Sequence, residues 1–434
     1  MRSVMARTGR LPRVAREAVQ ALGLGSPRPL PDERRPDMLA PLPLPQDAAA
    51  RLACGRPRTR CQAGGTSLIL ANGWQVEVLS GRGGKQPAAI LIDTGTQRVL
   101  LDAGASLETA HDDGADAWLG RALAKGLDAV LITHDHVDHI GAAHRVPAAI
   151  PLYVTAEAAA GLPPGRPWQA MPLRGQWRLE RPGARPVLVR TGASGHSLGG
   201  VWLHLSDPDD VDGGVFYSGD VSLESTWLAF DVPPRAELAL LDASYGMDDT
   251  AQPLRQAALA ARLDRPTLLP VPPSGRALEM ALWLDALGRR DWSMDSACRD
   301  VLAQALAAPA HQFAPGVQAR LAALQPRARQ FDAQAPLLLA ADADGQGGEA
   351  GRLLADPALR HQVIYTGYMP PALATAAAAG SCMLRWNVHP RLRDLGTLLE
   401  VTQASRWLPL FTAQPMPADP GVAPPRDPET RHAA

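Results

Sequence analysis

The stretch "LITHDHVDHIGA" at residues 131–142 constrains this chain more than any other feature, because it crowds three histidines and two aspartates into six residues. An apolar run at residues 129–133 precedes the crowded residues, and its length and composition predict a buried strand. Imidazoles and carboxylates this close together would repel and desolvate one another unless a cation lay among them. The stretch therefore predicts a metal site at the end of a strand.

The spacing within the stretch suggests how the ligands divide. His134 and His136 are two residues apart, so in an extended loop their side chains point the same way and can bind one ion. Asp138 and His139 lie past the following bend and can bind a neighbouring ion. Zinc is the natural ion for imidazole and carboxylate ligands, although manganese or iron could substitute. We expect one or two Zn²⁺ ions, with Mn²⁺ as the alternative.

Two further residues of metal-binding types lie downstream, each just after an apolar run. His196 lies in "ASGHSLGG" and Asp220 in "FYSGDVSL", each next to a glycine after an apolar run. Considered alone, each residue has a purely structural interpretation: His196 as a histidine in a turn, and Asp220 as an aspartate that caps a turn. Downstream of the ligand loop, both residues are predicted to be metal ligands.

Composition limits the classes of protein that need to be considered. With 434 residues, 46% hydrophobic and 20% charged, the chain predicts a globular protein of two or three domains. No apolar run approaches the roughly 18 residues of a membrane span, so we expect no membrane partner. The net charge of −1 means that any nucleic-acid partner must be held by local arginines. The four cysteines are scattered without a CxxC pair, which favours a cytoplasmic protein without a disulfide framework.

Arginine almost replaces lysine, which occurs only at Lys85 and Lys125. We ascribe this to the codon composition of a GC-rich bacterium and attach no functional meaning to it.

Pattern changes along the chain predict five segments. Residues 1–66 are Arg- and Pro-rich, and we expect a disordered or linker extension that is either native or the result of a start codon placed too early. Residues 67–245 contain short strands and form the first part of the main domain. Residues 246–379 form an insertion, residues 380–415 return to the main domain, and residues 416–434 form a disordered tail.

The predicted insertion has a repeated strand–turn–helix pattern. Three apolar strands, at residues 267–271, 337–340 and 363–365, each lead through a Gly-containing turn into a helix. This repetition predicts a parallel α/β unit whose helix N-termini gather along one edge. Such an edge binds anions readily, because unpaired N–H groups point into it. The third helix is predicted at residues 370–379.

Four motifs in order, "VLLDAG", "THDHVDH", "GHSLG" and "SGD", resemble the metallo-β-lactamase superfamily. The resemblance implies an α/β fold, namely an αββα sandwich, here with an inserted parallel α/β domain. It also implies that Asp102, in the first motif, orients the ligand loop. In that family the matching residues bind two metals: His134, His136 and His196 the first, Asp138 and His139 the second, and Asp220 both.

Later segments resemble the β-CASP nuclease branch of that superfamily. "LALLDASYG" is similar to its motif A with Asp242, and "RWNVHPRLRDL" is similar to its motif B with His389. The motif C histidine is replaced by Thr412 in "LFTAQP", and threonine is a poor zinc ligand. The replacement predicts a weaker second site or a single-metal enzyme, and it tilts the substrate slightly from RNA toward DNA.

The resemblance implies a nuclease, and the residues suggest how it would work. Metal ions lower the pKa of a bound water from about 15.7 to near 7 and so supply hydroxide at neutral pH. Asp220 would orient this nucleophile. His389, hydrogen-bonded to Asp242, would protonate the leaving oxygen or clamp the phosphate. Arg276, at a helix start after a glycine, is the candidate for binding a substrate phosphate.

We therefore expect a zinc-dependent hydrolase that cleaves phosphodiester bonds in nucleic acid, exonuclease-like, with DNA slightly favoured. The first alternative is a hydrolase of small esters, thioesters or lactones, and the near-neutral net charge supports it. The second alternative is a non-catalytic β-CASP-like scaffold subunit, which the replacement at Thr412 would allow. The sequence leaves the exo or endo mode and the oligomeric state open.

Overall fold

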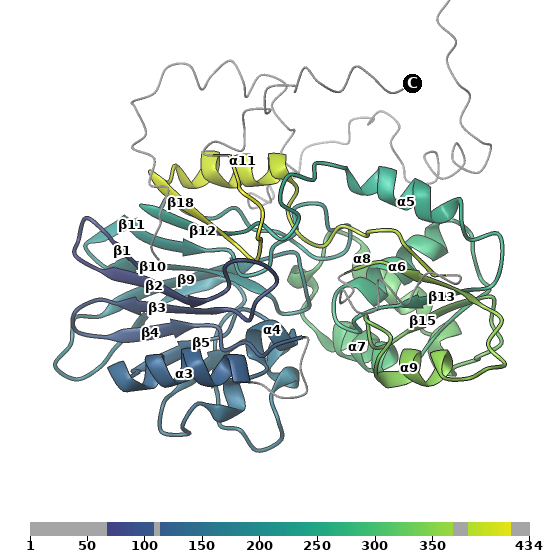
Figure 1. The fold of residues 1–434 in the computed structure, drawn as a ribbon, viewed down its shortest axis with the longest axis horizontal. Helices are drawn as coiled ribbons and strands as arrows, with labels where there is room; N and C mark the ends of the chain where they lie inside the picture. Colours follow the sequence, from purple (N-terminus) through teal and green to yellow (C-terminus); the bar gives the residue numbers. More distant parts are fainter. Residues whose placement is uncertain (1–66, 108–112, 368–380, 418–434) are drawn as a thin grey trace, which may run out of the picture.

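The computed structural model describes residues 67–107, 113–367 and 381–417 (Figure 1). The expected extension at residues 1–66 and the expected helix at residues 370–379 lie outside the described residues. The same holds for all but the first two residues of the expected tail. Two parts are visible side by side in Figure 1: two stacked sheets with helices outside them, and a smaller α/β part formed by residues of the middle of the chain.

The first sheet has seven strands in sequence order. Its first four strands are antiparallel, and the strands from the fourth onward are parallel. They are β1 (Ser67–Ile69), β2 (Gln75–Ser80), β3 (Ala89–Asp93), β4 (Arg98–Leu101), β5 (Ala129–Leu131), β6 (Leu152–Val154) and β7 (Gln169–Ala170). β3 and β4 form a hairpin, pairing antiparallel around the turn at residues 94–97.

The second sheet has six strands in the order β18-β12-β11-β10-β9-β8. The strands are β8 (Gly175–Leu179), β9 (Val187–Ala193), β10 (Val201–Asp207), β11 (Asp210–Tyr217), β12 (Leu238–Asp242) and β18 (Arg406–Leu410). β18 follows the insertion in sequence and pairs parallel with β12, which precedes the insertion. The chain thus leaves and re-enters the main domain through neighbouring strands.

Side-chain alternation explains why the two sheets stack. In β3, Ile90 and Ile92 point into the core between the sheets, whereas Leu91 points to the outer face. Because both faces are buried, the strand is apolar throughout rather than alternating with polar residues. The outer face of the first sheet packs against α3 (Asp113–Lys125), and that of the second packs against α11 (Leu392–Thr402). The result is the expected αββα sandwich, visible in Figure 1 with α11 and α3 outside the two sheets.

The inserted part contains a five-stranded sheet in the order β14-β15-β13-β16-β17, in which every pair is parallel, as predicted. Its strands are β13 (Thr267–Pro270), β14 (Trp292–Met294), β15 (Leu337–Ala340), β16 (Gln362–Tyr365) and β17 (Ser381–Met383). The accompanying helices are α5 (Gln252–Ala260), α6 (Arg276–Ala286), α7 (Ser296–Ala307), α8 (Val317–Leu324) and α9 (Gly348–Leu354). One face of the sheet packs on α6, α7 and α8, and the other packs on α9.

One boundary differs from the expectation that residues 380–415 belong to the main domain. β17 lies after residue 380 but pairs with β16, so the insertion's sheet extends past that residue. After the ligand loop, α4 covers Val137–Ile140, and a 3₁₀ turn, Ala143–Arg145, follows it. In the described ranges, no helix has both the length and the apolar character needed to cross a bilayer.

Candidate metal centre

The predicted ligand loop lies at the carboxyl end of β5 and continues into α4. His134 and His136 come from the loop, and Asp138 and His139 come from α4 (Val137–Ile140). His196 is in the turn between β9 and β10, and Asp220 follows β11. All six lie at one end of the two sheets, which is why residues 86 positions apart in sequence can meet.

Glycines make this convergence sterically possible at two of the ligands. Gly195, which precedes His196, has φ +72°, and a Cβ there would lie 2.3 Å from Ser222 O. Gly219, which precedes Asp220, has φ +53°, and its Cβ would lie 2.9 Å from the Thr133 side chain. A larger residue at either position would displace the ligand that follows it.

Four ligand residues form the first group. Atoms of His134, His136, His196 and Asp220 that can bind a metal all lie within 4.8 Å of one another. His136 Nδ1 and His196 Nε2 are 3.0 Å apart, and His196 Nε2 is 3.5 Å from Asp220 Oδ2. Three imidazoles and one carboxylate are a suitable ligand set for Zn²⁺.

The remote ring nitrogen of each histidine in this group has a hydrogen-bond partner. The pairs are His134 Nδ1 with Thr133 Oγ1 (3.0 Å), His136 Nε2 with Ser274 O (3.4 Å) and His196 Nδ1 with Val388 O (2.7 Å). Metal-binding histidines are oriented in this manner, because the bond on one nitrogen turns the lone pair of the other toward the ion. The residues present therefore fit a metal. Two of the three carbonyl and hydroxyl partners come from the insertion and the segment that follows it.

The electrostatics of the group also fit a cation. Burial lowers the pKa of His134 well below its ordinary value, and the neighbouring His139 and His136 lower it further. Burial likewise lowers the pKa of His196, so both imidazoles are held in the neutral form that binds metals. Burial alone would raise the pKa of Asp220, but Lys85, His139 and His389 outweigh it and hold that pKa well below its usual range. Asp220 is therefore an anion.

Asp102 lies beneath the ligand loop and is fully buried. Its carboxylate accepts hydrogen bonds from Thr133 N (2.7 Å), Tyr217 Oη (2.7 Å) and His139 Nδ1 (2.8 Å). Its backbone φ of +58° is in the left-handed region, which Asp tolerates better than most residues. These contacts are what the predicted orienting residue would make.

Asp138, His139 and Asp220 form a second group of possible ligands. Sequence analysis missed a cation inside it: Lys85 Nζ lies 2.8 Å from Asp138 Oδ2 and 3.4 Å from Asp220 Oδ2. Burial would lower the pKa of Lys85, but the carboxylates of Asp138, Asp220 and Asp242 raise it above its usual value. A second divalent ion placed among these residues would have to share the two carboxylates with the ammonium group, although Asp138 Oδ2, His139 Nε2 and Asp220 Oδ1 are buried without a hydrogen-bond partner among the described residues.

His389 and Asp242 also meet at the centre. Asp242 ends β12, and its Oδ2 accepts a 2.7 Å hydrogen bond from His389 Nδ1. The other oxygen, Asp242 Oδ1, accepts from Ser244 N and Ser244 Oγ, so the carboxylate is fixed. The His389 ring lies 5.0 Å from the His196 ring, and its Nδ1 is 3.6 Å from Asp220 Oδ2. The two residues picked from separate motifs are therefore in direct contact beside the metal group.

Thr412 lies just after β18, and its Oγ1 accepts a hydrogen bond from Gln414 N at 3.1 Å. It belongs to none of the ligand groups found among the described residues. Its neighbour Phe411 places its ring 5.3 Å from the His139 ring and 5.4 Å from Lys85 Nζ.

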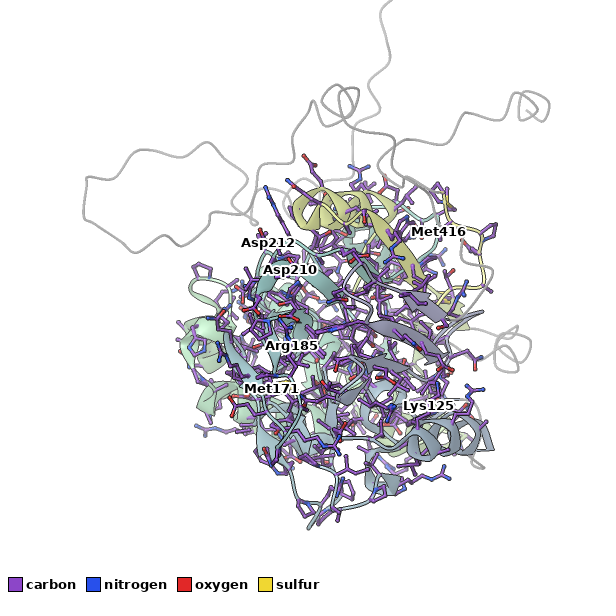
Figure 2. All side chains as sticks on the ribbon, turned by 90° about the vertical axis from the view of Figure 1, so that its left-hand side faces the viewer. Lys125, Met171, Arg185, Asp210, Asp212 and Met416 are labelled. Atoms are coloured by element: carbon purple, nitrogen blue, oxygen red, sulfur yellow. The ribbon has the colours of Figure 1, made fainter. Side chains whose placement is uncertain are left out.

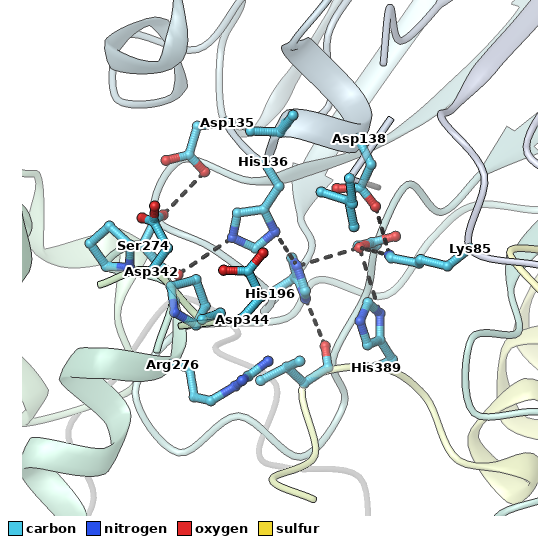
Figure 3. A pocket seen from close by; sticks show the side chains of 18 of the residues that line it. Lys85, Asp135, His136, Asp138, His196, Ser274, Arg276, Asp342, Asp344 and His389 are labelled. Atoms are coloured by element: carbon cyan, nitrogen blue, oxygen red, sulfur yellow. Dashed lines mark hydrogen bonds and ion pairs between the residues drawn. The ribbon is translucent and has the colours of Figure 1, made fainter. Parts of the chain in front are cut away.

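A pocket of about 680 Å³ opens onto the centre. His136, His196 and Asp220 of the first ligand group lie on one wall of the pocket. The loops before α6 and α9 form the other wall (Figure 3). Arg276 begins α6, is 6% exposed and lines the pocket, as the predicted phosphate-binding residue would. The α9 loop contributes Asp342 and Asp344, so the edge predicted to bind anions carries negative charge as well. No motif in the sequence indicated that these two carboxylates face the ligand loop.

Comparisons with known proteins agree with this geometry. Residues 82–270 match the sequence model of the family described as the Metallo-beta-lactamase superfamily. No curated protein was found to match the chain. A similar solved structure is that of a protein described as of unknown function from Enterococcus faecalis V583, with 14% identity and a TM-score of 0.51. The alignment covers 81% of this chain and 98% of that chain, and at this identity the likeness shows the fold alone. The match over residues 82–270, the αββα sandwich and the cluster of His and Asp side chains agree with one another, so the chain resembles the metallo-beta-lactamase superfamily in sequence, fold and site.

Proposed function

We propose that the protein is a metal-dependent hydrolase that cleaves phosphodiester bonds in nucleic acid. The observation that carries the proposal is the position of His389, hydrogen-bonded to Asp242 at the edge of the metal group and lining the same pocket as Arg276. A proton donor, a metal group and a buried guanidinium around one pocket are the parts that phosphodiester hydrolysis uses.

The metal itself would be held by His134, His136, His196 and Asp220. When bound, it would supply a water of lowered pKa and neutralise charge on the substrate oxygens. Asp220 is an anion within the group, so its carboxylate can accept a hydrogen bond from the attacking water and hold that water in place. Asp220 can do this from the position that it has in the structure.

His389 supplies the proton for the leaving oxygen. The hydrogen bond to Asp242 holds a proton on Nδ1 of the imidazole and leaves Nε2 as the nitrogen from which a proton can pass to the leaving oxygen. Asp242 is itself held by Ser244, so the imidazole cannot turn away. A positioned acid of this kind contributes typically 10²- to 10⁴-fold to a rate.

Arg276 can bind the phosphate. Its guanidinium is buried and donates a long hydrogen bond of 3.4 Å to Thr366 Oγ1, while Nε has no partner among the described residues, so donors remain for a ligand. A guanidinium matches a phosphate through paired N–H groups. The preference for DNA over RNA, and for exonuclease action, rests on the β-CASP resemblance and on Thr412 in place of the motif C histidine.

A second candidate is a hydrolase of small esters, thioesters or lactones. Asp342 and Asp344 line the wall opposite the ligand loop, and carboxylates there would repel the phosphates of a polynucleotide. Burial raises the pKa of Asp342, and the neighbouring Asp344 and Asp295 raise it further, which reduces this repulsion. The third candidate, a non-catalytic scaffold, ranks last because the first metal group is complete.

One experiment separates the three. The full chain, purified without chelator, is incubated with end-labelled single-stranded DNA, the matching RNA and a panel of thioesters and lactones, each with Zn²⁺ or Mn²⁺. Cleavage of oligonucleotides that His389→Ala abolishes supports the proposal. Turnover of the thioester or lactone panel alone supports the second candidate, and a metal-loaded protein without any hydrolysis supports the third.

A further inference from the structure

Lys85 occupies the middle of the second ligand group. Its Nζ is 2.8 Å from Asp138 Oδ2 and 3.4 Å from Asp220 Oδ2, and its side chain is 15% exposed. Figure 3 shows the side chain reaching across to these carboxylates from the side opposite Arg276. An ammonium group between two buried carboxylates meets the same electrostatic need as a bound metal ion.

The loop that carries Lys85 is fixed at both ends to the centre. Ala88 N donates to Asp138 O at 2.7 Å, and Phe411 N donates to Gly81 O at 2.8 Å. The Phe411 ring lies 5.4 Å from Lys85 Nζ, within the range of a cation–π contact. The backbone of α4 and the segment after β18 therefore position Lys85.

The ligand expected at this group is also engaged elsewhere. His139 Nδ1 lies 2.8 Å from Asp102 Oδ2, and His139 Nε2 lies 3.1 Å from Asp220 Oδ1. His139 Nδ1 is therefore taken by Asp102, whereas His139 Nε2 makes no hydrogen bond among the described residues and faces the two carboxylates that Lys85 contacts. Thr412, where a further ligand was sought, is hydrogen-bonded within its own turn.

We propose that this protein holds a single metal ion, in the group of His134, His136, His196 and Asp220, and that the Lys85 ammonium takes the place of a second ion. The inference rests on the metal centre proposed above but not on its substrate. Geometry supports it: the ammonium lies 2.8 Å from Asp138 Oδ2 and 3.4 Å from Asp220 Oδ2, so an ion placed there would compete with it for both carboxylates.

The replacement of an ion by a lysine has a consequence for the substrate. Lys85 lines the pocket on the side of Asp138 and Asp220, away from Arg276. Its remaining donor can bind an anionic oxygen of the substrate at a point where a second metal would otherwise do so. This contact depends neither on free metal concentration nor on chelators.

The number of metal ions per chain tests the proposal. Wild-type protein is saturated with Zn²⁺, passed through a desalting column and measured by inductively coupled plasma mass spectrometry. We expect one ion per chain in the wild type and two in Lys85→Ala, because removing the ammonium exposes Asp138, His139 and Asp220 to a second ion. The matched control is Lys125→Ala, the other lysine of the chain, which lies at the end of α3 and pairs with Glu77 (Figure 2). That variant should keep one ion.

Cobalt provides an independent readout. Co²⁺-substituted wild type should show the spectrum of one high-spin ion, and Lys85→Ala should add a second set of absorption bands at a second equivalent. Two ions in the wild type would overturn the proposal, as would one ion in a Lys85→Ala protein whose melting curve is cooperative. If Lys85→Ala does not fold, the wild-type count alone decides. Absence of any metal from the wild type would overturn the metal centre, whereas a failure to cleave phosphodiesters would touch only the proposed function.

Discussion

Asp102 Oδ2 accepts a hydrogen bond of 2.8 Å from His139 Nδ1, and the same carboxylate is bonded to the first residue of the ligand loop, Thr133. One buried side chain thereby joins the end of β4, the ligand loop and α4. Because the carboxylate has no contact with water, each of its bonds must be replaced if it is removed.

Substituting Asp102 should weaken both the fold and the metal site. We expect Asp102→Ala to lower the free energy of unfolding by about 3–5 kcal/mol, the usual cost of breaking a buried charged pair. We also expect Zn²⁺ affinity to fall about 10- to 100-fold, as for other residues that orient ligands. Urea denaturation and competition with a chromogenic chelator measure these effects. Asp102→Asn keeps the size and tolerates the left-handed backbone, so its loss should be smaller; an unchanged urea midpoint for Asp102→Ala would contradict the role.

His389→Ala should separate metal binding from turnover. We expect full metal content and a decrease in kcat of about 10²- to 10⁴-fold, because the variant removes a proton donor and no ligand of the first group. Metal analysis and steady-state kinetics on a labelled oligonucleotide provide the measurement. His311→Ala, an exposed histidine of the insertion, is the control and should behave as the wild type. Equal losses of metal and activity in His389→Ala would mean that His389 is a ligand.

Removing the metal should destabilise the protein. Without a cation, His136 Nδ1 and His196 Nε2 face each other at 3.0 Å beside a buried carboxylate. A ligand present at about 100 times its Kd stabilises the native state by roughly 2.7 kcal/mol. We therefore expect dialysis against EDTA to lower Tm and added Zn²⁺ to restore it. A Tm that is the same before and after dialysis, in a protein shown to have lost its metal, would argue against a buried metal centre.

Charge variants of the pocket walls should act in opposite directions on a polyanionic substrate. Arg276→Met should decrease kcat/KM for oligonucleotides by roughly 10- to 100-fold, since a hydrogen bond to a charged group contributes about 1.5–3 kcal/mol. Asp342→Asn should lower KM for the same substrate, because it removes a repelling charge. Arg360→Ala, outside the pocket, serves as the control. If no oligonucleotide cleavage is detected and Asp342→Asn raises KM for a thioester, the result would support the small-molecule hydrolase.

The pH dependence of stability should reveal a histidine far from the metal centre. Burial lowers the pKa of His204 to about 4, with a contribution from Arg190, whereas an unfolded histidine has a pKa of about 6.5. As the pH falls from 6.5 to 4, the unfolded chain takes up a proton that the native state does not. Stability is therefore present above pH 6.5 and is lost below it, by roughly 3 kcal/mol at most. Urea unfolding of the wild type and His204→Gln between pH 7 and pH 4 should show a shallower loss in the variant; parallel curves would exclude this role.

That four residues of the first possible metal group lie together could be expected from the sequence, because their signal is local. His134 and His136 share a loop whose spacing alone turns them to one side, and His196 and Asp220 follow glycines at the ends of apolar strands. The parallel sheet of the insertion was also predictable, because strand, glycine turn and helix recur within short windows. Each of these features is determined by residues that are neighbours in the chain.

The second group was decided by tertiary structure alone. Lys85 lies in a glycine-rich turn with no motif around it, and only the pairing of β2 with β3 and the bond from Ala88 to Asp138 bring it to the carboxylates. Asp342 and Asp344 reach the pocket only because the insertion packs against the ligand loop. Local sequence determines which side chains can bind a cation. Which cation they meet depends on the folding together of segments distant in sequence, and no short-range pattern records that.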